Sequence, residues 1–106
     1  MKPIVRVIIP ALNEEKSIDK VIKDIPADLV SEIIVIDNNS TDNTTGVAAQ
    51  AGATTLKETE PGYGASCLKG INYIAHLGQD TDIIVFMDGD YSDYPEELGA
   101  IIEPIL

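Results

Sequence analysis

Two aspartates one residue apart, Asp88 and Asp90, directly follow the apolar run 83–87. A run rich in β-branched residues is typical of a strand buried in a sheet, and charges at its end would lie at the open edge of that sheet. Side chains at i and i+2 of an extended chain point to the same side, and Gly89 between them has no Cβ to obstruct a ligand. Neighbouring carboxylates repel each other unless a cation neutralises them, and Mg²⁺ is commonly held by one or two carboxylates plus substrate phosphates. The pattern predicts a metal and phosphate site, with an ordinary Asp-Gly-Asp turn as the alternative.

Composition restricts the classes of function that this site can serve. The chain has 106 residues, 44% of them hydrophobic, which predicts one domain with a single core. A net charge of −11 argues against sequence-independent binding to nucleic acid, which needs clustered positive charges, so no nucleic-acid partner is expected. Phosphate must then be bound through a metal ion, backbone N–H groups or helix N-termini.

The single cysteine and the lengths of the apolar runs indicate the cellular compartment in which the protein is expected. Cys67 has no Cys or His at metal-ligand spacing, which favours a half-buried structural thiol in a reducing compartment. No apolar run approaches the roughly 20 residues that a membrane span needs. We therefore expect a cytoplasmic protein whose membrane contact, if it has any, is peripheral.

Hydrophobic periodicity predicts the elements that position the aspartates. Strands are expected at 4–9 (ending at Pro10), 33–36, 53–57 and 83–87. The first helix is expected to begin at Asn13 as N-cap, with Glu14 and Glu15 in its first turn. A second helix should span 44–51 before Gly52, and a fourth should start at Pro95. The third helix should end near residue 78 and bury one apolar face, formed by Cys67, Leu68, Ile71, Ile74 and Ala75.

Four strands alternating with four helices predict an α/β fold. The expected architecture is a three-layer α/β/α sandwich with a mostly parallel, Rossmann-like sheet and right-handed crossovers. In such sheets ligands bind beyond the carboxyl ends of the strands, where the strand order reverses. The loops 10–14 and 37–42 and the pair 88–90 should all lie on that edge, which favours a phosphate or nucleotide site.

Four short motifs resemble those of a known family. They are PALNEE at 10–15, DNNSTD at 37–42, GYGA at 62–65 and DGD at 88–90. In this order and spacing they resemble the nucleotide-side motifs of family 2 glycosyltransferases, which have the GT-A fold, and most closely those of dolichyl-phosphate mannose or glucose synthases. The resemblance implies inverting transfer of a sugar from a nucleotide diphosphate sugar, of the UDP-glucose or GDP-mannose type. The implied acceptor is polyprenyl phosphate at the cytosolic membrane face.

The resemblance also implies roles for individual residues. Within the nucleotide-binding set, Pro10, Leu12 and Glu14 would contact the nucleoside, Asp37 and Asn38 the base, and Asp88 with Gly89 the diphosphate. Asp88 and Asp90 would hold Mg²⁺ or Mn²⁺. Three positions depart from the pattern, because many members carry an acid at Asn38, a basic residue at Tyr63 and Gln at Ser92.

Structural roles compete with some of these assignments. Ser40, Thr41 and Asp42 could cap the second helix, and Glu14 could be a first-turn partner of the helix dipole. Residues 1–106 are expected to form a single domain truncated after the Asp-X-Asp motif. In the family the general base lies beyond the position of Leu106, so the chain alone should be weakly active or inactive.

Other interpretations stay open at this point. An uncovered edge at the fourth strand would favour a homo-oligomer. Two alternative functions are a non-catalytic nucleotide-sugar-binding module and a haloacid-dehalogenase-like phosphatase with Asp88 as its nucleophile.

Overall fold

The computed structural model describes residues 3–78 and 80–87, and the elements follow in strict alternation. The strands and helices are β1 (Val5–Ala11), α1 (Ile18–Asp24), β2 (Glu32–Asp37), α2 (Thr44–Gln50), β3 (Thr54–Lys57), α3 (Tyr63–His76) and β4 (Ile83–Phe86). The predicted α/β alternation is confirmed over this part of the chain. The helix expected to start at Pro95 lies outside the described residues.

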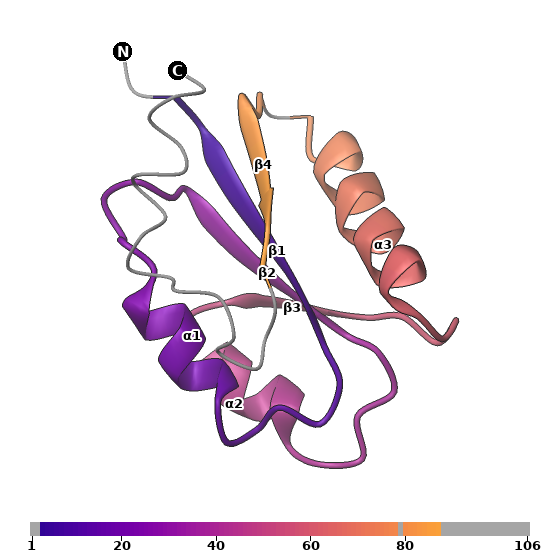
Figure 1. Ribbon diagram of the computed structural model, residues 1–106. Coiled ribbons are helices and arrows are strands. Elements are labelled where there is room, and N and C mark those ends of the chain that lie inside the picture. The colour runs from indigo at the N-terminus through magenta and orange to yellow at the C-terminus, as the bar shows by residue number, and fades with distance from the viewer. Residues whose placement is uncertain (1–2, 79, 88–106) are drawn as a thin grey trace.

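The four strands form one parallel sheet in the order β3-β2-β1-β4. Helices α1 and α2 cover one face and α3 covers the other, which gives the expected three layers (Figure 1). The strand order reverses between β1 and β4, because the chain moves outward from β1 to β3 and then returns to the other side of β1. The carboxyl ends of β1 and β4 are therefore where a ligand site is expected.

Alternating side chains of β1 supply both halves of the core. Val5, Val7 and Ile9 pack with α1 and α2, whereas Ile8 packs with β2 and with Ile74 of α3. Each of these five side chains is buried, as expected for a central strand covered on both faces. The core thus fixes both layers of helices to one strand.

β1 continues through Pro10, so the expectation that it stops there was wrong. Pro10 pairs in register with Ile36 of β2. The N–H of Met87 donates to the carbonyl of Ile8, which shows that alternate residues of β1 bond toward β4. Pro10 lies two residues further on, so its missing N–H falls on the β4 side, beyond the last β1–β4 pair at Ile8 and Phe86.

The first helix begins later than predicted. α1 starts at Ile18, with Ser17 as its N-cap, so Asn13 is not the cap and the two glutamates precede the helix. Asn13 has a φ of 56°, a left-handed conformation that asparagine tolerates better than most residues. Its side chain is bonded to a loop far away in sequence, which overrides its local tendency to start a helix.

The buried face of α3 also differs from the prediction. Small residues face the sheet: Ser66 and Gly70 are buried together with Ile74, whereas Leu68 is 61% and Ile71 37% exposed. A Cβ built on Gly70 would lie 2.8 Å from the Cδ1 atom of Ile8, so only glycine allows the helix to approach β1 this closely. Close approach to the sheet, rather than apolar periodicity, selects the inner face of this helix.

β4 is less buried than a central strand. Among the residues that the structure describes, it pairs only with β1, and Ile84 and Phe86 are 37% and 41% exposed. The expectation of a strand buried on both faces was therefore wrong for β4. Its position at an edge of the described sheet agrees with the sequence-based prediction.

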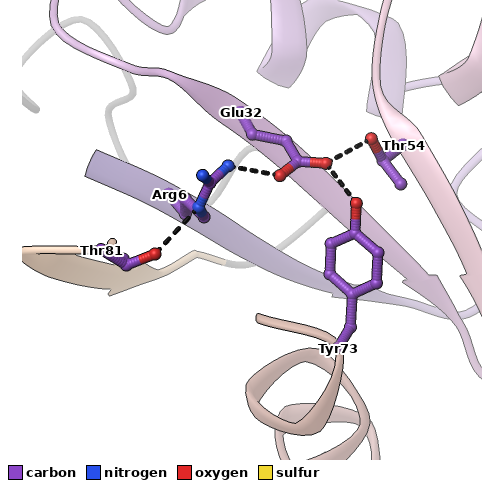
Figure 2. A network of polar contacts seen from close by, with 5 residues as sticks. All are labelled: Arg6, Glu32, Thr54, Tyr73 and Thr81. Carbon is purple, nitrogen blue, oxygen red and sulfur yellow. Dashed lines mark hydrogen bonds and ion pairs between the residues drawn. The ribbon is translucent and has the colours of Figure 1, made fainter. Parts of the chain in front are cut away.

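A polar network joins the amino ends of the strands to α3, and we call it the amino-edge network (Figure 2). Arg6 Nη1 lies 2.6 Å from Glu32 Oε1, and Arg6 Nε donates to the Thr81 hydroxyl over 2.9 Å. The other carboxylate oxygen of Glu32 accepts hydrogen bonds from Tyr73 at 2.6 Å and Thr54 at 2.7 Å. The hydrogen bond to Glu32 raises the pKa of Tyr73 above its ordinary value of 10.0. One carboxylate thereby ties β1, β2, β3 and α3 together.

Candidate functional site

At the opposite, carboxyl edge, the loop after β1 (residues 12–17) is bonded to the loop after β2 (residues 38–43). Asn13 lies at the centre of this junction. Its backbone N–H donates to Ser40 Oγ over 2.9 Å, and its Oδ1 accepts the N–H of Thr41 over 2.8 Å. The two polar clusters that the sequence predicts on one edge therefore meet directly.

A second set of bonds continues the same junction toward α2. The N–H of Glu14 donates to Thr44 Oγ1 over 2.9 Å, and the N–H of Glu15 donates to Asp42 over 3.2 Å. Asp42 also accepts hydrogen bonds from the hydroxyl and N–H of Thr44, the first residue of α2. The bond from the Thr44 hydroxyl is the main reason that the pKa of Asp42 lies below its ordinary value of 3.8. The N-cap of α2 is Asn43, so Asp42 is not the cap that was predicted, although it bonds to the first residue of the helix; Ser40 and Thr41 bond instead to Asn13.

Asp37 and Glu14 both use their carboxylates within the protein. Asp37 is only 6% exposed, and it accepts hydrogen bonds from the N–H of Ser40 at 3.0 Å and the hydroxyl of Thr45 at 2.7 Å. Glu14 accepts a hydrogen bond from the Ser17 hydroxyl at 3.0 Å. A carboxylate has about four acceptor sites, so these contacts leave both groups able to accept further hydrogen bonds.

Asn38 holds the loop 58–62 against the end of β2. Its side-chain NH₂ donates to the carbonyls of Glu58 (3.1 Å) and Glu60 (2.7 Å), and its Oδ1 accepts the N–H of Gly62 (3.2 Å). Gly62 has a φ of 114°, a conformation that favours glycine. Asn38 therefore shapes the glycine-containing loop that leads into α3.

These elements enclose a pocket at the carboxyl edge, which we call the edge pocket. It has a volume of ≈ 220 Å³ and is lined by the end of β1, by the residue after β2 and by the start of α3: Pro10, Ala11, Leu12, Asn38, Gly62, Tyr63 and Ser66. None of these lining residues carries a charge. An uncharged slot of this size suits a flat ring better than it suits a diphosphate.

The structure brings together only part of the predicted site. Pro10, Leu12 and Asn38 meet in the edge pocket, and Glu14 and Asp37 lie in the loops beside it. Asp88, Gly89 and Asp90 lie outside the described residues. The strand leading to them ends at the same edge, since the N–H of Met87 donates to the Ile8 carbonyl over 3.1 Å. Within residues 3–78 and 80–87 there is no cluster of three His, Cys, Asp or Glu side chains that could hold a metal ion.

Comparison with known proteins identifies the family. The model of "Glycosyl transferase family 2" matches residues 6–106. The chain belongs to glycosyltransferase family 2. Protein RfbJ of Shigella flexneri is 38% identical over 104 residues, which cover 93% of this chain and 77% of RfbJ. An uncharacterized glycosyltransferase of Mycobacterium tuberculosis (strain H37Rv) is 42% identical over 98 residues, covering 92% of this chain and 42% of that protein.

Solved structures of a similar enzyme confirm the fold. Glucosyl-3-phosphoglycerate synthase from Mycobacterium tuberculosis, in complex with Mn²⁺, UDP and glucosyl-3-phosphoglycerate, matches with a TM-score of 0.82 and 31% identity. The match covers 98% of this chain and 40% of that chain. The same enzyme has been crystallised with Mg²⁺ and UDP. Our glycosyltransferase chain thus spans about two fifths of the length of these mycobacterial relatives.

Sequence reasoning missed two features of the site. Thr44 and Thr45 supply hydroxyls that join the loops, although they were interpreted only as helix residues. Ser66 lines the edge pocket but had no predicted role. The spacing of Ser66 and Gly70, two small residues one helical turn apart, is the signal that could have indicated a close approach to the sheet. Finally, no helix within the described ranges has the length and apolar character needed to cross a membrane.

Proposed function

We propose that this chain binds the donor of an inverting glycosyl transfer, a nucleoside diphosphate sugar. The observation that carries the proposal is the uncharged edge pocket at the carboxyl end of β1, which contains residues of the motifs that resemble nucleotide-side motifs of the family. Pro10 and Leu12 contact the nucleoside there, and Asn38 contacts the base or fixes the loop around it. Glu14 and Asp37, which retain acceptor capacity, bind nucleoside N–H or O–H groups from the adjoining loops.

Asp88 and Asp90 are proposed to hold Mg²⁺ or Mn²⁺, with Gly89 leaving room for the diphosphate. The fit rests on the chemistry of the donor set, since hard divalent cations prefer carboxylate oxygens, and on β4 ending beside β1 at the pocket edge. When bound, such a cation offsets the negative charge that develops on the departing nucleoside diphosphate. The chain's own contribution is to place the diphosphate beside that cation by anchoring the nucleoside in the edge pocket.

UDP is the first nucleotide to test, because relatives of known structure are complexes with UDP. The acceptor is a phosphate-bearing molecule in either of two forms. The motif resemblance favours polyprenyl phosphate, with the protein peripheral to the cytosolic membrane face, whereas the structural relatives are named for 3-phosphoglycerate. The two forms differ in whether transfer requires vesicles that contain the lipid.

Calorimetric titration with UDP and with GDP, each with and without Mn²⁺, tests donor binding. We expect Mn²⁺-dependent binding of one nucleotide that weakens at least about tenfold in Asp88→Asn, because one charged metal ligand is lost. Asp80→Asn is the matched control, since Asp80 is an exposed aspartate just before β4. It should leave the affinity unchanged.

The outcomes separate the alternatives. If neither nucleotide binds under any condition, the donor-binding function is refuted. Release of UDP from UDP-glucose in the presence of either acceptor would refute a non-catalytic nucleotide-sugar-binding module.

A further inference from the structure

The hydroxyl of Ser66 is a buried polar group without a partner. Ser66 is 0% exposed, and its Oγ has no hydrogen-bond partner among the described residues. Serine hydroxyls within helices commonly bond back to the carbonyl at i−4. Here that carbonyl, of Gly62, accepts the backbone N–H of Ser66 at 3.3 Å. Buried hydroxyls are nearly always satisfied, so an orphan in a native fold calls for a specific partner.

The position of Ser66 indicates what that partner is. Ser66 lines the edge pocket together with Leu12 and Tyr63, which are 52% and 55% exposed. Ser66 is thus the buried polar side chain of a lining whose apolar and aromatic members are exposed. Gly70, one turn along α3, allows this stretch of helix to lie close to β1, whose residues Pro10 and Ala11 line the same pocket.

The amide of Asn38, another polar side chain of the pocket, is already committed. Both N–H groups of the Asn38 amide donate to carbonyls of the loop 58–62, and its oxygen accepts the N–H of Gly62. The Ser66 hydroxyl, by contrast, still has its full hydrogen-bonding capacity. A hydroxyl can donate one hydrogen bond and accept two, which matches a nucleobase edge that carries a carbonyl oxygen beside an N–H group.

We propose that Ser66 Oγ hydrogen-bonds to the nucleobase of the bound nucleoside diphosphate in the edge pocket. This inference rests on the proposed function, since it names a contact within the same donor site. The pocket volume of ≈ 220 Å³ is smaller than the roughly 300–1,000 Å³ of sites for whole drug-sized ligands, so it fits one end of the donor. Its uncharged lining assigns it to the base rather than the diphosphate.

The test compares wild type, Ser66→Ala and Ser31→Ala by titration with UDP and Mn²⁺ and by thermal unfolding without ligand. Losing one hydrogen bond should weaken UDP binding about 3- to 10-fold in Ser66→Ala. The same variant should unfold at the wild-type temperature or slightly above it, because it removes an unsatisfied buried hydroxyl. Ser31→Ala, an exposed serine before β2, should change neither quantity.

The outcomes distinguish the role of Ser66 from the proposed donor binding itself. Wild-type affinity for UDP in Ser66→Ala overturns the assignment of Ser66 while donor binding stands. A lower unfolding temperature in that variant also overturns it, because the hydroxyl would then hold the fold rather than the ligand. Failure of the wild-type chain to bind UDP or GDP refutes the proposed function itself.

Discussion

At the amino edge of the sheet, Arg6, Glu32 and Tyr73 bond side chain to side chain, whereas at the carboxyl edge Asn13 and Asn38 bond mainly to backbone groups of loops. The first arrangement ties strands and a helix to one another. The second shapes loops, which leaves their surfaces available to a ligand. Side-chain hydrogen bonds to backbone offer loops a defined conformation in place of a helix or a sheet ladder.

The difference also appears in how completely the polar groups are satisfied. Both carboxylate oxygens of Glu32 accept hydrogen bonds from within the protein. At the other edge, the Ser66 hydroxyl has no partner among the described residues. The fully satisfied edge contributes stability, and the incompletely satisfied edge has capacity for binding.

Removing the central carboxylate of the amino-edge network should have the largest effect on folding. Glu32→Ala removes the carboxylate that pairs with the guanidinium of Arg6, whose side chain is 6% exposed. Breaking a buried pair from one side costs about 3–5 kcal/mol, and we expect the lower end because the Glu32 side chain is 18% exposed. Urea unfolding followed by circular dichroism measures the change in free energy.

The matched control for this prediction is Glu60→Ala, an exposed glutamate in the loop 58–62. It should change the free energy of unfolding by less than about 0.5 kcal/mol. Equal effects of the two variants would mean that the amino-edge network does not stabilise the fold.

Loosening the carboxyl edge should affect both folding and binding. Asn38→Ala removes three hydrogen bonds to the loop 58–62, worth about 2–3 kcal/mol in total at roughly 1 kcal/mol each. We expect faster amide exchange in that loop and about tenfold weaker UDP binding, because the loop forms one wall of the edge pocket.

The control is Asn39→Gly, which loses a single bond to the Thr59 carbonyl and keeps the left-handed backbone at this position. It should alter exchange and affinity much less. If Asn38→Ala leaves loop exchange at the wild-type rate, the carboxyl edge is not organised by this side chain.

The smallest expected effect is that of Tyr73→Phe, which removes one donor from the amino-edge network. At neutral pH the substitution should lower the free energy of unfolding by about 1.5 kcal/mol, as expected for the loss of a hydrogen bond to a charged acceptor. The folded pKa of Tyr73 lies above 10.0, so its contribution is complete below pH 10.0 and is lost as the pH rises beyond that value. Wild type should therefore lose stability in alkali more steeply than the variant does.

A double-mutant cycle sharpens this prediction. In a Glu32→Gln background, Tyr73→Phe should lower the free energy of unfolding by much less than in the wild type, because the charged acceptor is gone. Additive effects would show that the two residues act independently.

The alternation of β-branched runs with one-faced helices was enough to predict the three-layer sheet, because a parallel sheet of apolar strands needs helices over both of its faces. The start of α1 could not be predicted, since Asn13 is held by Thr41, 28 residues away. The inner face of α3 was missed for a related reason. Leu68 and Ile71 satisfy helical periodicity, but the close approach of Gly70 to Ile8 decides which side faces the sheet.

The same distinction applies to the candidate site. Pro10, Leu12 and Asn38 follow strands whose carboxyl ends share an edge, so topology alone brings them together. Ser66 comes from helix α3 rather than from the end of a strand, and its role depends on the distance between α3 and β1. Sequence pattern does not encode that distance except through the small residues that permit it.

The pairing of β1 with β4 also determines the order in which the sheet can be assembled. Their amino ends are joined by the bond from Ile4 to Asp82, across 78 residues. Closing so long a loop carries an entropic cost that neighbouring elements do not bear, and such distant pairings slow folding. Of the four described strands, β1 is thus synthesised first, but it must wait for β4, the last of them, before it has neighbours on both sides.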